Sequence, residues 1–227
     1  MESTLVILTR NEIDGIRSLF DKIPFNEFDE VFVMDCNSKD GTIKFFEDRG
    51  IRTINQRNPG RGNAFIESFE KANGKYLVFF SPDGNENPED IPKLIRELKK
   101  GYDLVIASRY TKGAKSDVSD DPMLIRKFGN IFFTFLVNLI WNVKVTDAIN
   151  GFRGVNKSRV KKLKLDAPGY EIEFQMTIRS AKLKYKIKEI PTIEKKRIGG
   201  ERKAKTFKLG FRFTKFLLKE LIKGRNF

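Results

Sequence analysis

The amino-acid sequence predicts an α/β domain built on a mostly parallel sheet with helices on both faces. Runs rich in β-branched and aromatic residues recur through the first half of the 227-residue chain, and segments with helical character lie between most of them. Strands that alternate with helices form parallel sheets covered on both sides. The length suffices for one such domain with its own core and a modest appendage.

Five strands and four helices are expected before residue 110. The strand runs end in polar segments, and the helices begin at turn and capping residues. The clearest helix start is Asn87-Pro88-Glu89-Asp90, which combines a cap, a proline at the first helical position and two acids. The expected strands are residues 4–9, 31–35, 51–54, 76–80 and 104–108, and the expected helices are residues 14–22, 42–48, 61–72 and 88–99.

After the fifth strand the strict alternation stops. Residues 110–122 are expected to form a polar loop, and residues 123–143 a helix whose apolar stretch is too short for a membrane span. A helix at residues 171–182, a strand at residues 187–193 and a basic loop at residues 197–205 should follow.

Residues 207–223 form the last expected helix, in which lysines and arginines stand beside large aromatic and aliphatic side chains. This mixture is typical of an amphipathic helix that lies in a membrane surface. The alternative is that this helix and residues 123–143 cover the sheet as ordinary core.

The chain contains no histidine and only one cysteine, Cys36. The absence of histidine excludes histidine general bases, Ser-His and Cys-His nucleophile pairs and histidine-ligated metals. A single cysteine excludes an internal disulfide, and Glu2 and Ser3 lead straight into a strand, unlike a signal peptide. We therefore expect a catalytic domain that faces the cytoplasm and uses carboxylates, amides, Lys and Arg, with or without a hard metal.

Positive charge is concentrated in the last third of the chain. The net formal charge is +14, of which residues 1–150 carry −2 and residues 151–227 carry +16. Nucleic acid, anionic lipid head groups and phosphate substrates are all polyanions that such a region can bind, and total charge does not choose among them.

Polar side chains follow the strands at the edge where open parallel sheets bind ligands. Asp35 ends the second strand, where it can accept hydrogen bonds from a nucleobase or ribose, although acids at strand ends also form turns and caps. Asp83 and Asn85 are spaced i, i+2 after the fourth strand, a usual way to present oxygen ligands to Mg²⁺ or Mn²⁺ beside a diphosphate. The alternative for this segment is a simple Pro-Asp-Gly turn.

Basic residues near these strand ends are candidates for phosphate contacts. Gly60-Arg61-Gly62 precedes a helix, where backbone N–H groups and a guanidinium can meet a phosphate. Arg109 and Arg126 can clamp phosphates, and Lys203 lies in the basic loop. For each of them the alternative is a plain turn or a solvated surface charge.

Seven segments, in order and at plausible spacing, resemble glycosyltransferase family 2, which has the GT-A fold. Within that family they resemble the dolichyl-phosphate mannose synthase branch and its polyprenyl-phosphate glycosyltransferase relatives. The resemblance spans nearly the whole chain. The segments are the run from Val6 to Glu12, the run from Val33 to Thr42, Gly60-Arg61-Gly62-Asn63-Ala64, Ser81-Pro82-Asp83, Val105-Ile106-Ala107-Ser108-Arg109-Tyr110, the run from Asp147 to Arg153, and Gly200-Glu201-Arg202-Lys203.

The chain departs from the family pattern at two positions. The first acid of the family's Asp-x-Asp metal motif is Ser81, and the second acid of its Asp-Asp pair is Cys36. The resemblance implies that Asp83 is the main ligand of Mg²⁺ or Mn²⁺, with Asn85 in place of a glutamine. Losing one carboxylate should weaken divalent binding or change the metal preference.

The resemblance also implies substrates and roles. The donor would be a GDP- or UDP-sugar, the acceptor a polyprenyl (dolichyl-type) phosphate at an anionic membrane surface on the cytoplasmic face, and transfer would invert the anomeric carbon. Residues 1–206 would form the GT-A domain, with a nucleotide-binding half (1–109) and an acceptor half (110–206), followed by the basic amphipathic helix at residues 207–227. The implied donor contacts are Thr9, Asn11, Glu12, Asp35, Arg61, Pro82, Asp83 and Lys203; the acceptor-phosphate contacts are Arg109, Arg126 and Asn130; and Asp83, Arg109 and Arg126 are the catalytic set.

Three other functions compete with this hypothesis. A family member acting on a sugar hydroxyl in cell-surface polysaccharide synthesis would need a general base, and no obvious one stands before the acceptor helix. A sugar-phosphate nucleotidyltransferase would need a Gly-rich basic loop after the first strand, where Thr9–Glu12 has none. A basic nucleic-acid-binding protein would need a recognisable binding motif, which is absent from the sequence, so no nucleic-acid partner is expected.

Overall fold

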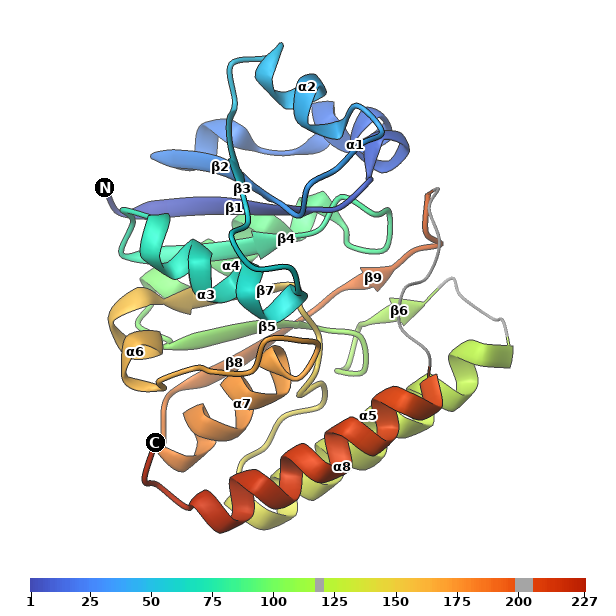
Figure 1. The fold of residues 1–227 in the computed structure, drawn as a ribbon. Coiled ribbons are helices and arrows are strands. Elements are labelled where there is room, and N and C mark those ends of the chain that lie inside the picture. The colour runs from blue at the N-terminus through green and yellow to red at the C-terminus, as the bar shows by residue number, and fades with distance from the viewer. Residues whose placement is uncertain (117–120, 199–205) are drawn as a thin grey trace.

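A central sheet organises the computed structural model, which describes residues 1–116, 121–198 and 206–227, with side chains of the two long helices described from residues 125 and 209 onward. The strand order is β3-β2-β1-β4-β7-β5-β8, and every neighbouring pair is parallel except the two that β7 makes (Figure 1). The predicted mostly parallel sheet is therefore confirmed. The strands are β1 (Ser3–Thr9), β2 (Glu30–Asp35), β3 (Arg52–Asn55), β4 (Tyr76–Phe80), β5 (Leu104–Ser108), β7 (Arg153–Asn156) and β8 (Ile187–Pro191).

Helices cover both faces of the sheet because the central strands are apolar on both sides. In β1, Leu5 and Ile7 pack into one core, whereas Val6 and Leu8 pack into the other. The first face is covered by α1 (Ile13–Leu19), α2 (Thr42–Glu47) and α4 (Ile91–Lys99), and the second by α3 (Arg61–Lys71), α6 (Lys157–Lys162) and α7 (Ile172–Lys182).

The second half of the chain contains elements that the sequence pattern did not predict. Besides β7 and α6, the expected loop at residues 110–122 contains β6 (Lys115–Ser116), which pairs with β9 (Ile193–Glu194). The strand expected at residues 187–193 begins where predicted but is not continuous, since β8 ends at Pro191 and β9 begins at Ile193. Strand β5, which pairs with β8, ends at Ser108, opposite Pro191, so the chain leaves the main sheet there and pairs with β6 instead.

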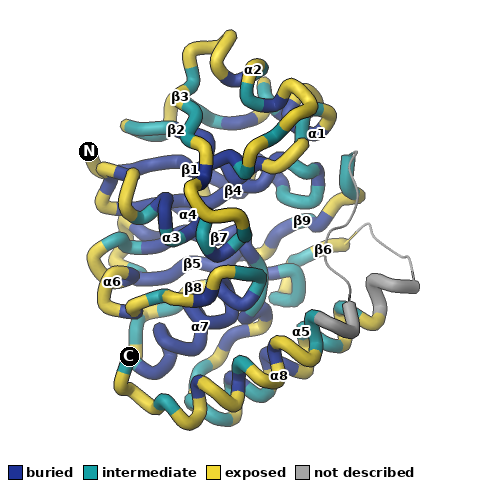
Figure 2. The backbone as a smooth tube through the Cα atoms, viewed as in Figure 1, coloured by how far each residue is buried: buried dark blue, intermediate teal, exposed yellow. Residues whose placement is uncertain are grey.

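Two long helices, α5 (Asp121–Trp141) and α8 (Thr206–Lys223), pack side by side beyond α7 (Figure 1). Their inner sides form a third core with α7, made by Phe133, Val137, Phe174, Ile178, Phe213 and Leu217. Exposed residues recur along the outer sides of both helices (Figure 2), and many of them are apolar. Ten of the eleven exposed large hydrophobic residues of the described chain lie on these two helices: Ile125, Phe128, Ile131, Phe132, Phe135, Leu139, Phe211, Leu218, Leu221 and Ile222.

The expectation that these helices cover the sheet as core is confirmed for their inner faces, and the membrane-surface interpretation stays a prediction for their exposed faces. Among the helices described, none has the length and hydrophobicity that crossing a membrane would require.

A buried ionic cluster fixes α8 to α7. The side chains of Arg179 and Glu220 are completely buried, and that of Lys182 nearly so. Glu220 accepts hydrogen bonds from Arg179 Nε (3.0 Å) and Nη2 (2.7 Å) through one carboxylate oxygen and from Lys182 Nζ (2.7 Å) through the other. The C-terminal helix is therefore an integral part of the fold.

Candidate active site

Two adjoining cavities lie at the edge where the parallel strands end. The larger has a volume of about 410 Å³ and reaches toward α5 and α8. The smaller, of about 190 Å³, lies at the ends of β1 and β2. Five residues line both cavities and mark their border: Arg61, Ser81, Asp83, Tyr170 and Arg197.

The smaller cavity combines apolar walls with a polar rim. Leu8, Met34 and Ala64 line it, as does Gln56, whose side-chain amide donates to the carbonyls of Asn58 (3.1 Å) and Gly60 (2.9 Å). The predicted donor residues Thr9, Glu12, Arg61 and Asp83 also line it, together with Arg10 and Cys36. A cavity lined by both apolar and polar groups suits a nucleoside.

Asp35 does not line either cavity. Its side chain is completely buried, and both carboxylate oxygens are engaged: Oδ1 accepts from Ser38 N (2.7 Å), and Oδ2 accepts from the hydroxyls of Thr9 (2.6 Å) and Ser38 (2.6 Å). In the structure Asp35 joins the loops after β1 and β2. This agrees with the alternative stated above, in which an acid at a strand end forms turns and caps. The neighbouring Cys36, not Asp35, stands in the cavity wall.

Asn11 has a similar structural role. It adopts a positive φ of 54°, its backbone N–H donates to Ser38 Oγ (2.7 Å), and its side-chain oxygen accepts from Lys39 N (2.8 Å). These bonds join the loop after β1 to the loop after β2, and Asn11 lines neither cavity.

Asp83 lies in the turn after β4 at the border of the two cavities. Its Oδ1 accepts from Asn85 N (3.0 Å), and its Oδ2 is bound by Arg197 Nη1 (2.9 Å). Arg197 Nη2 also binds both carboxylate oxygens of Glu12 (2.6 and 2.8 Å), so one guanidinium bridges two predicted donor residues. The sequence placed Arg197 only in a basic loop, since nothing in the local pattern reveals which carboxylates it meets.

The segment at residues 195–198 covers this turn through backbone bonds. Lys195 N donates to Asn85 O (3.2 Å) and Ile198 N to Asp83 O (2.8 Å). Gly84 permits this contact because it has a φ of +94° and because a Cβ there would come within 2.7 Å of Ile198. The predicted Pro82 is buried beneath the turn, where a Cβ on Gly15 would lie 2.0 Å from its carbonyl oxygen, and it lines neither cavity.

Glu86 is a site residue that the sequence pattern did not reveal. It lines the larger cavity, and its Oε2 accepts a hydrogen bond from Ser81 N (2.7 Å). Burial, together with the nearby charge of Asp83, raises the pKa of Glu86 to about 8.

The oxygen atoms on this turn fit a divalent cation in part. Asn85 Oδ1 is buried and has no hydrogen-bond partner in the described structure, the sole side-chain atom in that position. It lies two residues from the Asp83 carboxylate, and both are oxygen ligands of the kind that Mg²⁺ and Mn²⁺ prefer. No group of three His, Cys, Asp or Glu residues able to hold a metal occurs within the described chain, so a metal here would need further ligands from a bound diphosphate.

Arg61 begins α3 and connects the two cavities. It forms an ion pair with Glu173 of α7 and reaches Ser81 Oγ at 3.5 Å. Burial alone would lower the pKa of Arg61, but the Glu173 carboxylate beside it raises that pKa above the ordinary value, so the guanidinium stays charged.

Part of the backbone that the sequence offered to a phosphate, at Gly62 in the Gly60-Arg61-Gly62 segment, is bound within the protein. Gly62 N (2.9 Å) and Asn63 N (3.3 Å) both donate to the carbonyl oxygen of Pro168. Gly62 is required for this approach, because a Cβ there would lie 1.9 Å from Ala167 O. Of that predicted phosphate site, Gly60 lines the smaller cavity and Arg61 lines both cavities.

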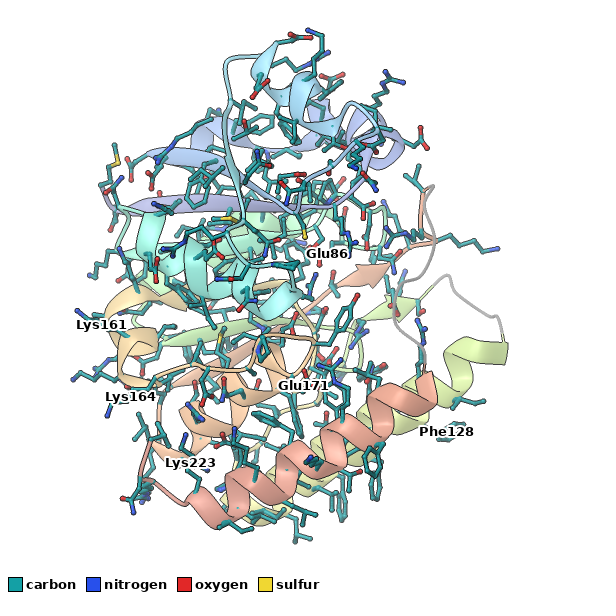
Figure 3. The ribbon with its side chains drawn as sticks, in the orientation of Figure 1. Glu86, Phe128, Lys161, Lys164, Glu171 and Lys223 are labelled. Carbon is teal, nitrogen blue, oxygen red and sulfur yellow. The ribbon has the colours of Figure 1, made fainter. Side chains whose placement is uncertain are left out.

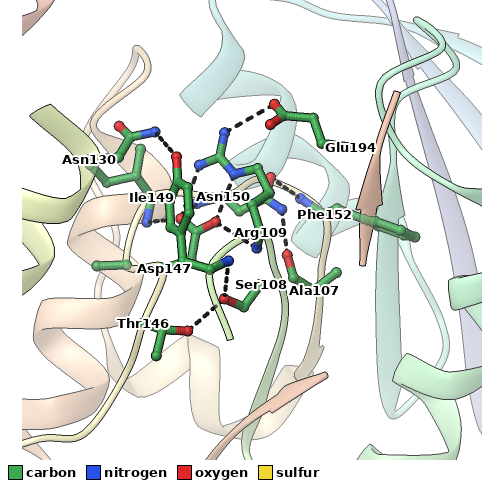
Figure 4. A network of polar contacts seen from close by, with 12 residues as sticks. Ala107, Ser108, Arg109, Asn130, Thr146, Asp147, Ile149, Asn150, Phe152 and Glu194 are labelled. Atoms are coloured by element: carbon green, nitrogen blue, oxygen red, sulfur yellow. Dashed lines mark hydrogen bonds and ion pairs between the residues drawn. The ribbon is translucent and has the colours of Figure 1, made fainter. Parts of the chain in front are cut away.

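Arg109 projects from the end of β5 into the larger cavity, held by a polar network (Figure 4). Its Nε and Nη2 donate to Asp147 at 2.7 and 3.0 Å, and its Nη1 lies 3.6 Å from Glu194. Burial would lower the pKa of Arg109, but the Asp147 carboxylate raises it, so its charge is fixed. Asp147 in turn accepts the backbone N–H groups of Ile149 (3.4 Å) and Asn150 (3.2 Å).

The other predicted acceptor residues line the same cavity from α5. Arg126 and Asn130 face it together with Lys127, and Asn130 Nδ2 donates to Tyr110 Oη (3.3 Å). Leu209 and Phe213 of α8 complete this wall. The predicted donor contact Lys203 lies outside the described residues.

Curated relatives resemble the chain over most of its length. A dolichol-phosphate mannosyltransferase from Pyrococcus furiosus is 31% identical over 218 residues, which are 90% of this chain and 60% of that protein. A UDP-N-acetylglucosamine–dolichyl-phosphate N-acetylglucosaminyltransferase from Methanococcus voltae is 28% identical over 82% of this chain and 83% of its own length. The chain thus spans about 60% of the length of the Pyrococcus protein.

Solved structures agree with the observed architecture. Glucosyl-3-phosphoglycerate synthase from Mycobacterium tuberculosis, in complex with Mn²⁺ and UDP-glucose, matches 98% of this chain and 79% of its own with a TM-score of 0.70 at 22% identity. This likeness identifies the fold as the predicted GT-A type. Residues 4–164, well over half of the sequence, match Glycosyl transferase family 2. The chain therefore belongs to glycosyl transferase family 2.

Proposed function

We propose that the protein transfers a sugar from a GDP- or UDP-sugar to a polyprenyl phosphate, with inversion, at a membrane surface. One observation carries the proposal: the larger cavity leads from Asp83 past Arg109 and Arg126 to the helices that expose the apolar surface. A substrate with an anionic head and a long apolar tail fits a cavity that leads from cationic side chains to an exposed apolar surface. The names of the Pyrococcus and Methanococcus relatives support a dolichyl-phosphate acceptor.

The donor would occupy the smaller cavity and the border between the two. The nucleoside would lie against Leu8 and Met34, and its diphosphate would reach Arg61 and Asp83. Thr9 and Glu12 would contribute from the rim, whereas Asp35 and Asn11 would act by shaping the loops. Lys203 stays a predicted donor contact.

Mg²⁺ or Mn²⁺ would be held by Asp83 and Asn85 beside the diphosphate. Such a cation neutralises the charge that develops on a departing nucleoside diphosphate. Arg61, already charged and buried at the border, would stabilise the same leaving group from the protein side.

A phosphate acceptor removes the need for a histidine-like general base. A lipid phosphate is anionic at neutral pH and can attack the anomeric carbon directly once cations hold it in line with the donor. Arg109 supplies a charge that Asp147 holds in one orientation, and Arg126 and Asn130 approach from α5. Inversion follows from a single in-line displacement.

The exposed faces of α5 and α8 would lie in an anionic membrane surface. Phe128 is 70% exposed and Ile222 is 89% exposed, and Phe128 projects from α5 away from the sheet (Figure 3). Basic residues of α8 such as Lys215 and Lys219 would meet the head groups. We place this surface on the cytoplasmic face, which the free Cys36 supports because thiols persist in reducing compartments.

The test is direct transfer to lipid. The protein is incubated with radiolabelled GDP- and UDP-sugars and a polyprenyl phosphate, and label is counted in the organic phase. Wild type should transfer one sugar, Asp83→Ala should lose transfer, and Lys44→Ala, on the exposed side of α2, should match wild type. Equal transfer by Asp83→Ala would reject the site.

The competing functions give different results in the same experiment. Label in a water-soluble oligosaccharide would indicate a hydroxyl acceptor. Salt-sensitive DNA binding, without any stabilisation by GDP or UDP, would indicate a nucleic-acid-binding protein.

A further inference from the structure

We propose that Glu86 takes the place of the acid that is absent at position 81 and completes, with Asp83 and Asn85, a three-oxygen site for a divalent cation. The inference rests on the proposed function in one respect, since the donor diphosphate would supply the remaining ligands. It goes beyond that function by assigning a ligand that the sequence pattern does not contain.

The position of the Glu86 carboxylate is the first support. The turn after β4 folds back so that Ser81 N donates to Glu86 Oε2 at 2.7 Å, which brings the carboxylate against residue 81. The second oxygen of Glu86 makes no hydrogen bond to a described residue, and Glu86 lines the larger cavity beside Asp83. One oxygen therefore holds the turn, and the other is open to a ligand.

Asn85 gives the second, independent support. Its Oδ1 is buried without a hydrogen-bond partner in the described chain, and a buried acceptor left in this way costs about 1–3 kcal/mol. A hard cation would satisfy that oxygen. Asp83, Asn85 and Glu86 together offer three oxygens from one turn, and Mg²⁺ completes an octahedron of six with phosphate oxygens and water.

The present partners of Asp83 are compatible with this site. Asp83 Oδ2 is held by Arg197 Nη1, so a cation would exchange one guanidinium contact for its own. Arg197 would keep its two hydrogen bonds to Glu12. Arg61, the other cation at the border, is already paired with Glu173. The site can thus gain a divalent charge without leaving an arginine unpaired.

The experiment measures Mn²⁺ binding without turnover. Electron paramagnetic resonance titrations of free Mn²⁺ are run with UDP or GDP present and no sugar donor or lipid. Glu86→Gln keeps an oxygen that can accept the Ser81 N–H but removes the charge. The dissociation constant for Mn²⁺ should rise about tenfold or more in Glu86→Gln, and binding should be lost in Asp83→Asn.

The matched control is Glu189→Gln. Glu189 is another largely buried carboxylate, and it accepts the backbone N–H groups of Thr146 and Asp147 (2.8 Å each), far from the Asp83 turn in the chain. Its substitution should leave Mn²⁺ affinity unchanged. A second variant restores the missing acid: Ser81→Asp, added to Glu86→Gln, should recover most of the affinity. Thermal unfolding of each variant confirms that it is folded.

Each outcome decides between roles. Unchanged Mn²⁺ affinity in Glu86→Gln, with loss in Asp83→Asn, overturns the inference and leaves the donor site intact. Lost sugar transfer in Glu86→Gln with unchanged Mn²⁺ affinity also overturns it and gives Glu86 a role in transfer other than metal binding. If wild type transfers sugar to lipid with chelator present and binds no Mn²⁺ with either nucleotide, the inference fails while the proposed function stands.

Discussion

Replacing Glu220 should detach the C-terminal helix from the rest of the molecule. Glu220→Ala removes the only carboxylate that contacts both Arg179 and Lys182 among the described residues. The helix it belongs to supplies Leu209 and Phe213 to the larger cavity. A change at Glu220, which lines neither cavity, would therefore alter the acceptor side.

The loss of unfolding free energy in Glu220→Ala depends on the partners that Arg179 and Lys182 retain. Arg179 would retain Asp166 (3.1 Å) and the carbonyls of Leu163 and Lys164. Lys182 would retain the backbone oxygen of residue 220 (2.6 Å) and its contacts with the rings of Trp141 and Phe227. Breaking a buried ion pair by removing one partner costs about 3–5 kcal/mol. Because Arg179 stays partly paired, we expect the lower end, about 3 kcal/mol.

Urea unfolding, followed by circular dichroism, measures this loss. Asp48→Ala is the control, since its ion pair with Lys44 is exposed and worth less than about 1 kcal/mol. Glu220→Gln, which keeps the volume and one acceptor, should lose less than Glu220→Ala. A loss below about 1 kcal/mol for Glu220→Ala would refute the reasoning that the cluster anchors α8.

Three further predictions concern the cavities. Gly62→Ala should destabilise the fold by about 1–3 kcal/mol because the new Cβ would collide with Ala167 O. Gly129→Ala has open space around it and should be neutral or stabilising by up to about 1 kcal/mol. Chemical denaturation compares the two variants, and equal effects would contradict the close approach at Gly62. Arg109→Lys loses the paired hydrogen bonds to Asp147, so kcat/KM for the lipid phosphate should fall about 10- to 100-fold in the transfer assay, and an unchanged value would remove Arg109 from the acceptor site. In the folded protein the pKa of Glu86 is about 8, above its ordinary value of 4.5, so between these two pH values the folded state binds a proton that the unfolded state has lost. The free energy of unfolding should therefore fall as the pH rises from 4.5 to 8. Urea unfolding in chelator at several pH values should show a shallower decline for Glu86→Gln than for wild type, and parallel curves would count against the pKa shift.

The donor edge of the fold could be predicted because it depends on local patterns. Apolar runs ending in polar residues located β1, β2, β4 and β5, and parallel strands bring such ends to one edge. This rule placed Asp83 and Arg109 at the site, where the structure has them. It did not predict that the strand-end acid Asp35 is hydrogen-bonded by two hydroxyls and an amide of its own loops, and the donor contact of Asp35 stays a prediction.

Features that depend on distant contacts could not be predicted. In the sequence Glu86 is one of several acids in a polar turn, and only the folded chain brings its carboxylate to Ser81 N. Arg197 meets Glu12 across 185 positions of sequence. β7 is four residues long and begins Arg153-Gly154, which has no strand periodicity, and only pairing with β4 and β5 makes it a strand.

That short antiparallel strand also sets a distance within the reaction. Adjacent strands lie about 4.8 Å apart, so β7 keeps the axes of β4 and β5 about 10 Å apart. Because it runs against both neighbours, the chain enters it at the ligand edge, where Asn150 Nδ2 binds Ala107 O and Ala107 N binds Phe152 O. β7 thus fixes the separation between the turn that would carry the leaving diphosphate and the arginine that would carry the attacking phosphate.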